Sequence, residues 1–472
     1  MSNFHNLMQL FARLRDDGDE LIARATAGIL EAIGAQGELR FFVDGTVNGG
    51  HQGATVHLMR RIIALTGFKG RVTVVYLDII ASGGLGRTPE KLALLLPGLD
   101  PNRIESVALS FRSCRDIRFL NYDRRSQLAG QVRFGFTAGA DDMNINFARE
   151  LKTDYFLRLQ PYLWDDGPDK KTERFYESSR IETAAQYFYP VDHYRPFRAM
   201  PFKYEGAEYE AVDDEVWDWY ANRQSFDPDL KIRTANARVI YEAVRSNEQL
   251  LLWPVYGLHK FRGHLPRIAA NLVRCASEVQ RFYQRPVVLV LLNDAAEISH
   301  IPGLHNARLI RGYDAESGRY SDISATLRDT LAEAGNRQVI LAAIGAVPGN
   351  VYNWLYANCG LPGVFEGQNT SSLVISLGRP FIQIRRDSEN PYPATIADQD
   401  LIDAAERAHE AAVQLRDSND DVRGLAKTIE FIVAARDPAS MIYKYFHELG
   451  NYYQLEIHDK CFAGLIGLSL LF

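Results

Sequence analysis

Two short segments of the chain combine glycines with amide, hydroxyl and ionisable side chains, as ligand-binding turns do. The first is the segment 48–55, NGGHQGAT, in which the glycines allow the backbone to approach a ligand closely. His51 is its one titratable side chain, and an imidazole with an ordinary pKa of about 6.5 suits a general base near neutral pH. We therefore expect His51 to be a catalytic base, with Asp44 as a substitute. A histidine that is merely solvated or caps a helix is the alternative.

The second segment is 366–372, EGQNTSS, which lies between a short apolar stretch and a helical pattern. Small hydroxyl and amide side chains at the start of a helix, together with its free backbone N–H groups and its dipole, favour the negative charge of a diphosphate. Glu366 can accept hydrogen bonds from hydroxyl groups of a ligand. Plain helix capping by Asn369 or Thr370 is the alternative. Because capping needs only one such residue, the run of them favours ligand binding.

A third segment, 253–263, supplies positive charge. It reads WPVYGLHKFRG and begins within an apolar stretch. His259 and Arg262 would stabilise the negative charge of a departing diphosphate, and Tyr256, next to Gly257, could stack on a nucleobase. The alternatives are a solvated basic loop and a tyrosine that belongs to the core.

The sequence has no pattern typical of a metal site. The two Asp-x-Asp triplets, at 227–229 and 398–400, do not end apolar strands. The four cysteines lie far apart without a Cys-x-x-Cys pair. We therefore expect neither a metal nor a cofactor, and we expect the reduced thiols of a cytosolic protein.

The order of apolar segments predicts an α/β fold. Strand-like stretches at 40–44 and 72–78 enclose the glycine turn and a helical pattern, which together make a βαβ unit. Their continuous apolar runs are typical of parallel strands that are buried on both faces. The same order restarts after residue 250, with strands expected at 250–256, 286–292 and 338–344. We therefore expect two Rossmann-like domains.

These features also predict where the domains lie. Single cores stop growing at about 250–300 residues, so a chain of 472 residues has room for two. We expect an N-terminal domain over 1–248, with an irregular insertion rich in tyrosine, tryptophan and charge at about 165–248. We expect a second domain over 249–435, followed by a helical C-terminal tail over 436–472 that packs back on the first domain.

Composition argues against some partners. The chain has a net charge of −6, whereas proteins that bind polyanions usually have a basic surplus, so we expect no nucleic-acid partner. The N-terminal residues lack the apolar core of a signal peptide. The apolar stretch 461–472 is shorter than the roughly 20 residues that span a bilayer. We expect a cytoplasmic protein without a transmembrane segment.

The two glycine-containing segments resemble parts of GT-B glycosyltransferases. Residues 361–384 follow the order strand, EG-x-x-T, helix, LG-[RK]-P, strand, which is similar to the donor-binding segment of UDP-sugar transferases and UDP-GlcNAc epimerases. The GGH turn at 49–51 resembles the glycine loop of the bacterial lipid II GlcNAc-transferase. A closer pattern is that of the protein-arginine rhamnosyltransferases of elongation factor P. That family, however, has an aspartate base where this chain has His51, and acidic residues where it has Gln368 and Asn369.

The resemblance implies a metal-independent glycosyltransferase whose two Rossmann-like domains face a cleft. Catalysis would fall to His51, Glu366 and Asp44, and the acceptor stays open, with a protein side chain as one candidate. A nucleotide-sugar epimerase or hydrolase on the same fold, and a non-catalytic module that binds nucleotide sugars or a partner protein, are the alternatives. The nucleotide-diphosphate sugar would be held by Asn48, Gly49, Gly50, Tyr256, Gly257, His259, Arg262, Gly367, Gln368, Asn369, Thr370, Ser371 and Ser372.

Overall fold

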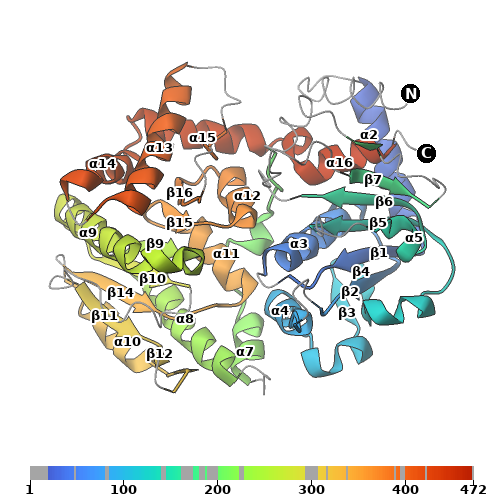
Figure 1. Cartoon of the computed structure of the whole chain (residues 1–472), viewed down its shortest axis with the longest axis horizontal. Coiled ribbons are helices and arrows are strands. Elements are labelled where there is room, and N and C mark those ends of the chain that lie inside the picture. Colours follow the sequence, from blue (N-terminus) through green and yellow to red (C-terminus); the bar gives the residue numbers. More distant parts are fainter. Residues whose placement is uncertain are drawn as a thin grey trace. The chain divides into compact units, whose positions relative to one another are not determined.

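The chain is an α/β protein, and its described strands form one mixed sheet, one parallel sheet and a separate two-stranded pair, with helices between them (Figure 1). It divides into two compact units, Met1–Lys203 with Tyr452–Phe472, and Tyr204–Asn451. The structure, a computed structural model, describes residues 20–46, 49–79, 84–139, 145–160, 174–179, 187–188, 200–222, 228–292, 307–314, 317–335, 338–386, 390–393, 399–419 and 422–469.

The first unit is built on a mixed sheet with the strand order β3-β4-β2-β1-β5-β6-β7-β8. The strands from β4 to β6 in that order are parallel, whereas β3, β7 and β8 pair antiparallel with their neighbours. The strands are β1 (Glu38–Val43), β2 (Arg71–Tyr76), β3 (Leu109–Phe111), β4 (Cys114–Asn121), β5 (Val132–Ala138), β6 (Thr153–Leu159), β7 (Arg174–Ser178) and β8 (Tyr187–Phe188). The helices are α2 (Glu20–Gly34), α3 (Gly50–Thr66), α4 (Thr88–Leu95), α5 (Phe147–Glu150) and α16 (Lys460–Ser469).

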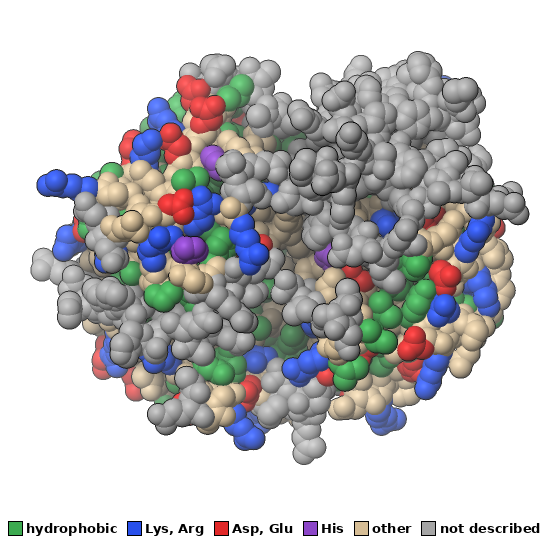
Figure 2. All heavy atoms as spheres, in the orientation of Figure 1, with side chains coloured by type: hydrophobic (Ala, Val, Ile, Leu, Met, Phe, Trp, Pro, Cys, Tyr) green, Lys and Arg blue, Asp and Glu red, His purple; other side chains and the backbone are tan. Residues whose placement is uncertain are grey.

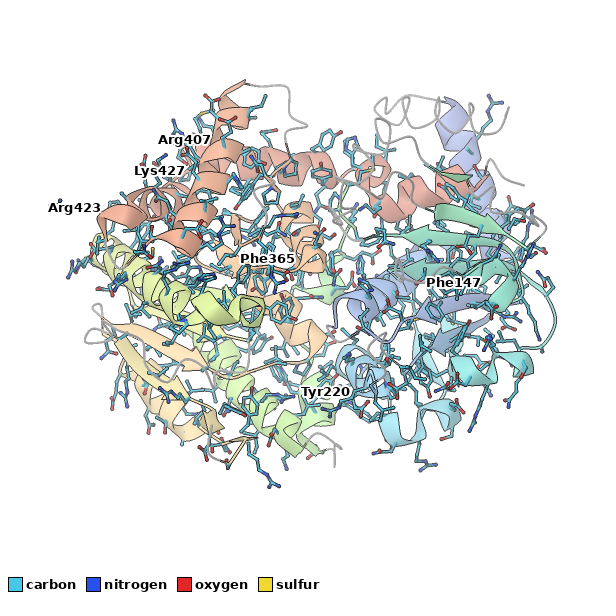
Figure 3. The ribbon with its side chains drawn as sticks, in the orientation of Figure 1. Phe147, Tyr220, Phe365, Arg407, Arg423 and Lys427 are labelled. Atoms are coloured by element: carbon cyan, nitrogen blue, oxygen red, sulfur yellow. The ribbon has the colours of Figure 1, made fainter. Side chains whose placement is uncertain are left out.

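Aromatic side chains of β1 build the core on both faces of this sheet. Successive side chains of a strand point to opposite faces, and Phe41 and Phe42 are both fully buried. The ring centroids of Phe41 and Phe136 of β5 lie 5.2 Å apart. On the other face, those of Phe42 and Phe147 of α5 lie 4.6 Å apart, and Figure 3 labels Phe147 beside the strands. The continuous apolar sequence of β1 is therefore explained by burial from both sides.

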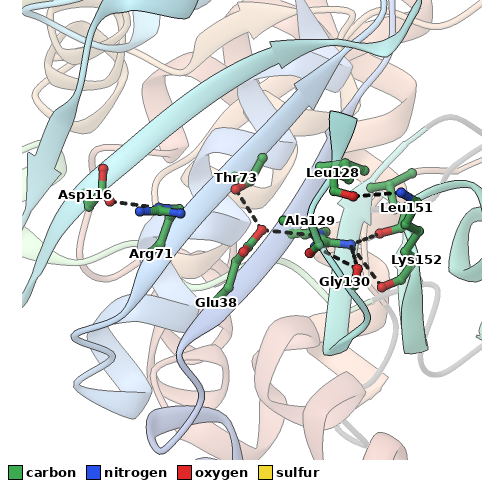
Figure 4. A network of polar contacts seen from close by, with 10 residues as sticks. Glu38, Arg71, Thr73, Asp116, Leu128, Ala129, Gly130, Leu151 and Lys152 are labelled. Carbon is green, nitrogen blue, oxygen red and sulfur yellow. Dashed lines mark hydrogen bonds and ion pairs between the residues drawn. The ribbon is translucent and has the colours of Figure 1, made fainter. Parts of the chain in front are cut away.

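A network of hydrogen bonds around Arg40 lies at the amino end of the first sheet (Figure 4). Arg40 of β1 is fully buried and donates hydrogen bonds to the carbonyl oxygens of Ala129 (2.7 Å) and Leu151 (2.6 Å). Its Nε also donates to Glu38 at 3.0 Å. Because a buried guanidinium must have its donors paired, this network fixes the loops that lead into β5 and β6.

The chain returns to the first unit at its C-terminal end. Helix α16 packs against β6 and α2, and its residues from Lys460 to Leu468 are buried. Arg61 of α3 donates to the fully buried Asp459 at 2.8 Å and also pairs with Glu456. The preceding helix, α15 (Met441–Tyr453), lies almost wholly in the second unit.

The second unit is built on a parallel sheet with the strand order β11-β14-β10-β9-β15-β16. Its strands are β9 (Leu251–Val255), β10 (Val287–Leu291), β11 (Ala307–Arg311), β14 (Val339–Ala343), β15 (Gly363–Phe365) and β16 (Phe381–Gln383), and a separate pair is formed by β12 (Tyr313–Asp314) and β13 (Arg319–Tyr320). The helices are α7 (Asp214–Asn222), α8 (Pro228–Ser246), α9 (Leu265–Tyr283), α10 (Ser324–Ala332), α11 (Gly349–Ala357), α12 (Gln368–Ser376), α13 (Gln399–Asp417), α14 (Ala426–Ala434) and α15.

The boundary between the units differs from the expected one at residue 248. The segment 204–248 belongs to the second unit, and most of it is helical rather than irregular. Helix α8 has 19 residues and packs against α10 and α7, and its Ala237 and Ile240 are fully buried. A helix of this length is stabilised when its apolar face packs against other elements. For α8 these elements belong to the second unit.

Two further features of the protein are the apolar length of its helices and the distribution of charge on its surface. Among the residues that the structure describes, no helix is long and apolar enough to cross a membrane. Figure 2 shows one face of the molecule, on which the coloured basic and acidic side chains intermingle.

Candidate functional site

Each sheet has a point at which the strand order reverses. In the first sheet, β2 and β4 lie on one side of β1, and β5 and β6 on the other. In the second sheet, β10 and β14 lie on one side of β9, and β15 and β16 on the other. Open α/β sheets bind ligands outside the carboxyl ends of the strands at such points. We therefore describe two candidate sites, one at the β1/β5 point and one at the β9/β15 point.

The β1/β5 site contains a histidine paired with a carboxylate. Asp44 follows β1, and its Oδ2 lies 2.6 Å from Nδ1 of His51. The two residues are only 6% and 8% exposed, so solvent screens their interaction little. Because the carboxylate binds Nδ1, it fixes the ring orientation and the tautomer with Nε2 as the acceptor.

The position of His51 differs in one respect from the expected one. The glycines predict a turn as far as Gly53, but α3 begins at Gly50, and the backbone N–H of Gly53 donates to the carbonyl of Gly49 at 2.9 Å. His51 is thus in the first turn of a helix. The helix can start this early because side-chain contacts to Asp44 hold its first residues.

Helix α3 is fixed to the end of β5 by two features. The Thr55 hydroxyl is 3.0 Å from both the carbonyl oxygen and the backbone nitrogen of Ala138. The next residue, Gly139, has a φ of +120°, and a Cβ at this position would lie 2.7 Å from Cγ of His51. Glycine is therefore required here both by its backbone conformation and by the imidazole packed against it.

A hollow opens along the same edge of the first sheet. It has a volume of about 630 Å³ and is lined by residues that include Tyr76 at the end of β2 and Asn121 at the end of β4. Arg103 and Arg124 add positive charge, and Glu105 accepts from Arg124 at 2.5 Å and from the Asn121 N–H at 2.8 Å. The first unit therefore offers an open hollow with polar and apolar lining beside the carboxyl ends of β2 and β4.

The β9/β15 site is built on a close approach of two strand ends. Gly257, two residues beyond β9, has a φ of +87°, and a Cβ there would lie 2.8 Å from Cβ of Glu366. Glu366 follows Phe365, the last residue of β15, which Figure 3 labels. The absence of a side chain at Gly257 lets Glu366 and the start of α12 come next to the end of β9.

Helix α12 begins with paired hydroxyl and amide groups. Its Thr370 hydroxyl lies 2.7 Å from the hydroxyl of Tyr352, and Tyr204 donates to Oδ1 of Asn369 at 3.4 Å. Ser371 donates to Oε1 of Gln383 at 3.1 Å, and Nε2 of Gln383 donates to the Glu366 carbonyl at 3.3 Å. None of these bonds is a helix cap, since Gly367 precedes the helix and no side chain caps it. The expected alternative of capping by Asn369 or Thr370 therefore does not describe this helix.

Two tyrosines beside this helix stay protonated at neutral pH. Burial, with a contribution from the charge of Glu366, raises the pKa of Tyr256 to about 12. Burial also raises the pKa of Tyr352 well above its ordinary value. Both rings therefore present neutral hydroxyl groups, which do not repel an anion at the start of α12.

Some expected site residues lie outside what the structure describes. Asn48 is not among the described residues, and the side chains of His259 and Arg262 are not described. Their backbone forms a 3₁₀-helix (Leu258–His264) that follows Gly257. Among the described residues, no group of three or more His, Cys, Asp and Glu side chains is placed to hold a metal ion.

The structure adds residues that sequence patterns miss. Gly139 and Lys91 belong to the β1/β5 site, and Tyr352 and Gln383 to the β9/β15 site. Gln383 could be found from its place in the strand that ends the 361–384 segment. Gly139 and Lys91 carry no such signal, because sheet order rather than chain order brings them to Asp44 and His51.

Comparison with family models and with curated proteins finds no match for this chain. The chemistry of the two sites is therefore the basis on which a function can be proposed.

Proposed function

We propose that the protein is a glycosyltransferase of the GT-B type that uses a nucleotide-diphosphate sugar. The observation that supports this most strongly is the division of chemistry between the two sites. The β1/β5 site has a buried imidazole–carboxylate pair, which suits proton transfer. The β9/β15 site has an uncapped helix start with neutral hydroxyl groups, which suits a diphosphate.

In this proposal the acceptor binds to the first unit, where the hollow beside β2 and β4 gives it room. Nε2 of His51 removes the proton from the acceptor nucleophile. Asp44 holds Nδ1–H and stabilises the imidazolium as it forms. The nucleophile bonds to the anomeric carbon of the sugar while the bond from that carbon to the diphosphate oxygen breaks.

The second unit binds the donor in this proposal. The N–H groups and dipole at the start of α12 stabilise the charge that develops on the departing diphosphate. Glu366 accepts hydrogen bonds from sugar hydroxyls, and His259 and Arg262, which follow Gly257, supply cations. Two Rossmann-like domains around a cleft are part of the same proposal. The reversal of strand order at β1 and at β9 supports them.

A thermal-shift screen against UDP, dTDP, GDP and ADP tests the donor site. A ligand at 100 times its Kd should stabilise the protein by about 2.7 kcal/mol. Thr370→Val should remove that shift, whereas Thr428→Val, which also loses one buried hydroxyl hydrogen bond in the second unit, should keep it. The absence of a shift with every nucleotide would overturn the proposal.

Turnover of the stabilising nucleotide's sugar conjugate then tests the reaction. Release of nucleoside diphosphate should fall by about 10²–10⁴-fold in His51→Gln, while the thermal shift stays unchanged. Turnover without any acceptor would favour an epimerase or hydrolase. Binding without turnover would favour a non-catalytic module.

A further inference from the structure

Lys91 lies on a helix that is fixed to the carboxyl edge of the first sheet. Helix α4 begins at Thr88, whose backbone N–H donates to Oδ1 of Asp78 at 2.8 Å and whose hydroxyl donates to the carbonyl of Leu77 at 2.7 Å. Both acceptors directly follow β2. One turn of this short helix therefore carries Lys91 toward the end of the neighbouring strand, β1.

The Lys91 ammonium group binds the turn that holds Asp44. Its Nζ donates to the carbonyl oxygen of Thr46. From the other side, Nε2 of Gln52 donates to the carbonyl oxygens of Asp44 (2.8 Å) and Thr46 (3.3 Å). The turn 44–46 is thus held by one side chain from α3 and one from α4.

The ammonium group also lies within an acidic surrounding. Asp44 and Asp78, at the ends of β1 and β2, and Glu90 on α4 all favour its charged form, whereas Arg87, which precedes α4, opposes it. Burial is the largest influence and lowers the pKa of Lys91. Its positive charge is therefore partly shielded from water and acts on the carboxylates next to it.

The positive charge of Lys91 counteracts an effect that would weaken His51 as the proposed base. A carboxylate 2.6 Å from Nδ1 of His51 stabilises the imidazolium form, and an imidazolium cannot accept a proton. A positive charge beside the same carboxylate works in the opposite direction, because it offsets part of the negative charge that the ring meets.

We propose that Lys91 is a positioning residue for His51: it holds the turn of Asp44 and offsets the charge of that carboxylate, so that the imidazole stays neutral near pH 7. This inference rests on the role of His51 as the base of the proposed function. Lys91 binds the carbonyl oxygen of Thr46, so it acts on His51 through this turn and through its charge.

NMR titration of the His51 ring tests the inference without any substrate. The His51 signal is identified by its loss in His51→Gln. Lys91→Gln keeps an N–H donor for Thr46 but removes the charge, and it should move the midpoint of the ring titration up by about half to one pH unit. At a fixed pH in the transition this is a three- to tenfold rise in the ratio of imidazolium to imidazole. Lys91→Arg keeps the charge and should leave the midpoint in place.

Arg87→Gln is the matched control. It removes the cation that directly precedes α4, but the Arg87 side chain is 63% exposed and solvent screens its charge, so the midpoint should move by less than about 0.2 unit. Equal shifts in Arg87→Gln and Lys91→Gln, or no shift in either, would overturn the proposal. If Lys91→Gln does not fold, the double variant Asp44→Asn/Lys91→Gln, which removes both members of the pair, is compared with Asp44→Asn. The double variant should have the higher midpoint, because the Lys91 charge acts on the ring whether or not residue 44 is charged, and equal midpoints would overturn the proposal. A midpoint shift in a protein that shows no turnover would separate this inference from the proposed function.

Discussion

The two carboxyl edges occupy equivalent places in their sheets but carry opposite kinds of chemistry. At the β1/β5 site the side chains are ionisable and close together, with His51 and Asp44 at 2.6 Å and Lys91 bound to the same turn. At the β9/β15 site neutral hydroxyl and amide groups surround the start of α12, and Glu366 is the ionisable residue beside them. A site of the first kind can move a proton, and a site of the second kind can offer N–H and hydroxyl donors to an anion. The two sheets therefore carry sites of different chemistry rather than two copies of one binding site.

The two edges nevertheless share one steric feature, and breaking it should have the largest effect. Gly139 and Gly257 both have positive φ values and both lie against a candidate residue, His51 and Glu366 respectively. Alanine at either position combines an unfavourable backbone conformation with a clash, and we expect each change to cost about 2–5 kcal/mol of unfolding free energy. Urea denaturation measures this. Gly139→Ala should also abolish turnover but spare the nucleotide shift, whereas Gly257→Ala should abolish the shift.

Gly67 provides the control for the glycine pair. Its φ is +59°, and a Cβ at this position would meet nothing within 4 Å. Gly67→Ala should therefore cost only the backbone preference, about 1 kcal/mol. If Gly139→Ala were as mild as Gly67→Ala, the packing of His51 on Gly139 would be contradicted.

The same contrast explains which parts of the molecule the sequence could predict. The β9/β15 site is mostly contiguous, because strand, polar segment and helix follow one another from Gly363 to Ser376. Periodicity and helix-start chemistry therefore indicated this strand, polar segment and helix, and the α/β class followed from the apolar runs. The β1/β5 site is assembled from β1, α3, α4 and β5, and no local pattern reports that β5 lies next to β1. His51 and Asp44 could be named from their residue types, but their mutual contact could not.

Two other differences also have physical causes. The turn predicted up to Gly53 is helical from Gly50, since tertiary contacts of His51 and Gln52 outweigh the low helix propensity of glycine. The segment 204–248 belongs to the second unit, because the packing partners of α8 lie later in the sequence than the helix itself. Composition alone, which is rich in tyrosine, tryptophan and charge there, does not reveal a partner.

Two neighbouring serines test the hydrogen bonds of the β9/β15 site. We expect an effect of intermediate size on the unfolding free energy. Ser371 and Ser372 are both fully buried. Ser371 binds Gln383, whereas the hydroxyl oxygen of Ser372 has no hydrogen-bond partner in the described part of the chain. Ser371→Ala leaves the amide oxygen of Gln383 buried and unpaired, so it should cost about 1–2 kcal/mol. Ser372→Ala should be neutral or slightly stabilising. Chemical denaturation measures the unfolding free energies of both variants. Equal losses would show that the Ser371–Gln383 hydrogen bond does not contribute to stability.

Alkaline pH should destabilise the protein through ionisation of Tyr256 at the β9/β15 site, and this is the smallest effect that we expect. Its pKa in the folded protein is about 12, against about 10 for an unperturbed tyrosine in the unfolded chain. A raised pKa favours the protonated form on folding, so the associated stability is complete below about pH 10 and is lost as the pH rises toward about 12. Tyr256→Phe cannot ionise and should lose less stability than the wild type between pH 9 and 10.5. The difference should reach about 0.5–1 kcal/mol after allowance for partial exposure of the ring. Tyr443→Phe, which alters a tyrosine that is 37% exposed, should decline in parallel with the wild type. If the stability of Tyr256→Phe also declined in parallel with that of the wild type, the phenol beside Glu366 would titrate as it does in water. This site would then be more open to solvent than the buried His51–Asp44 pair at the β1/β5 site.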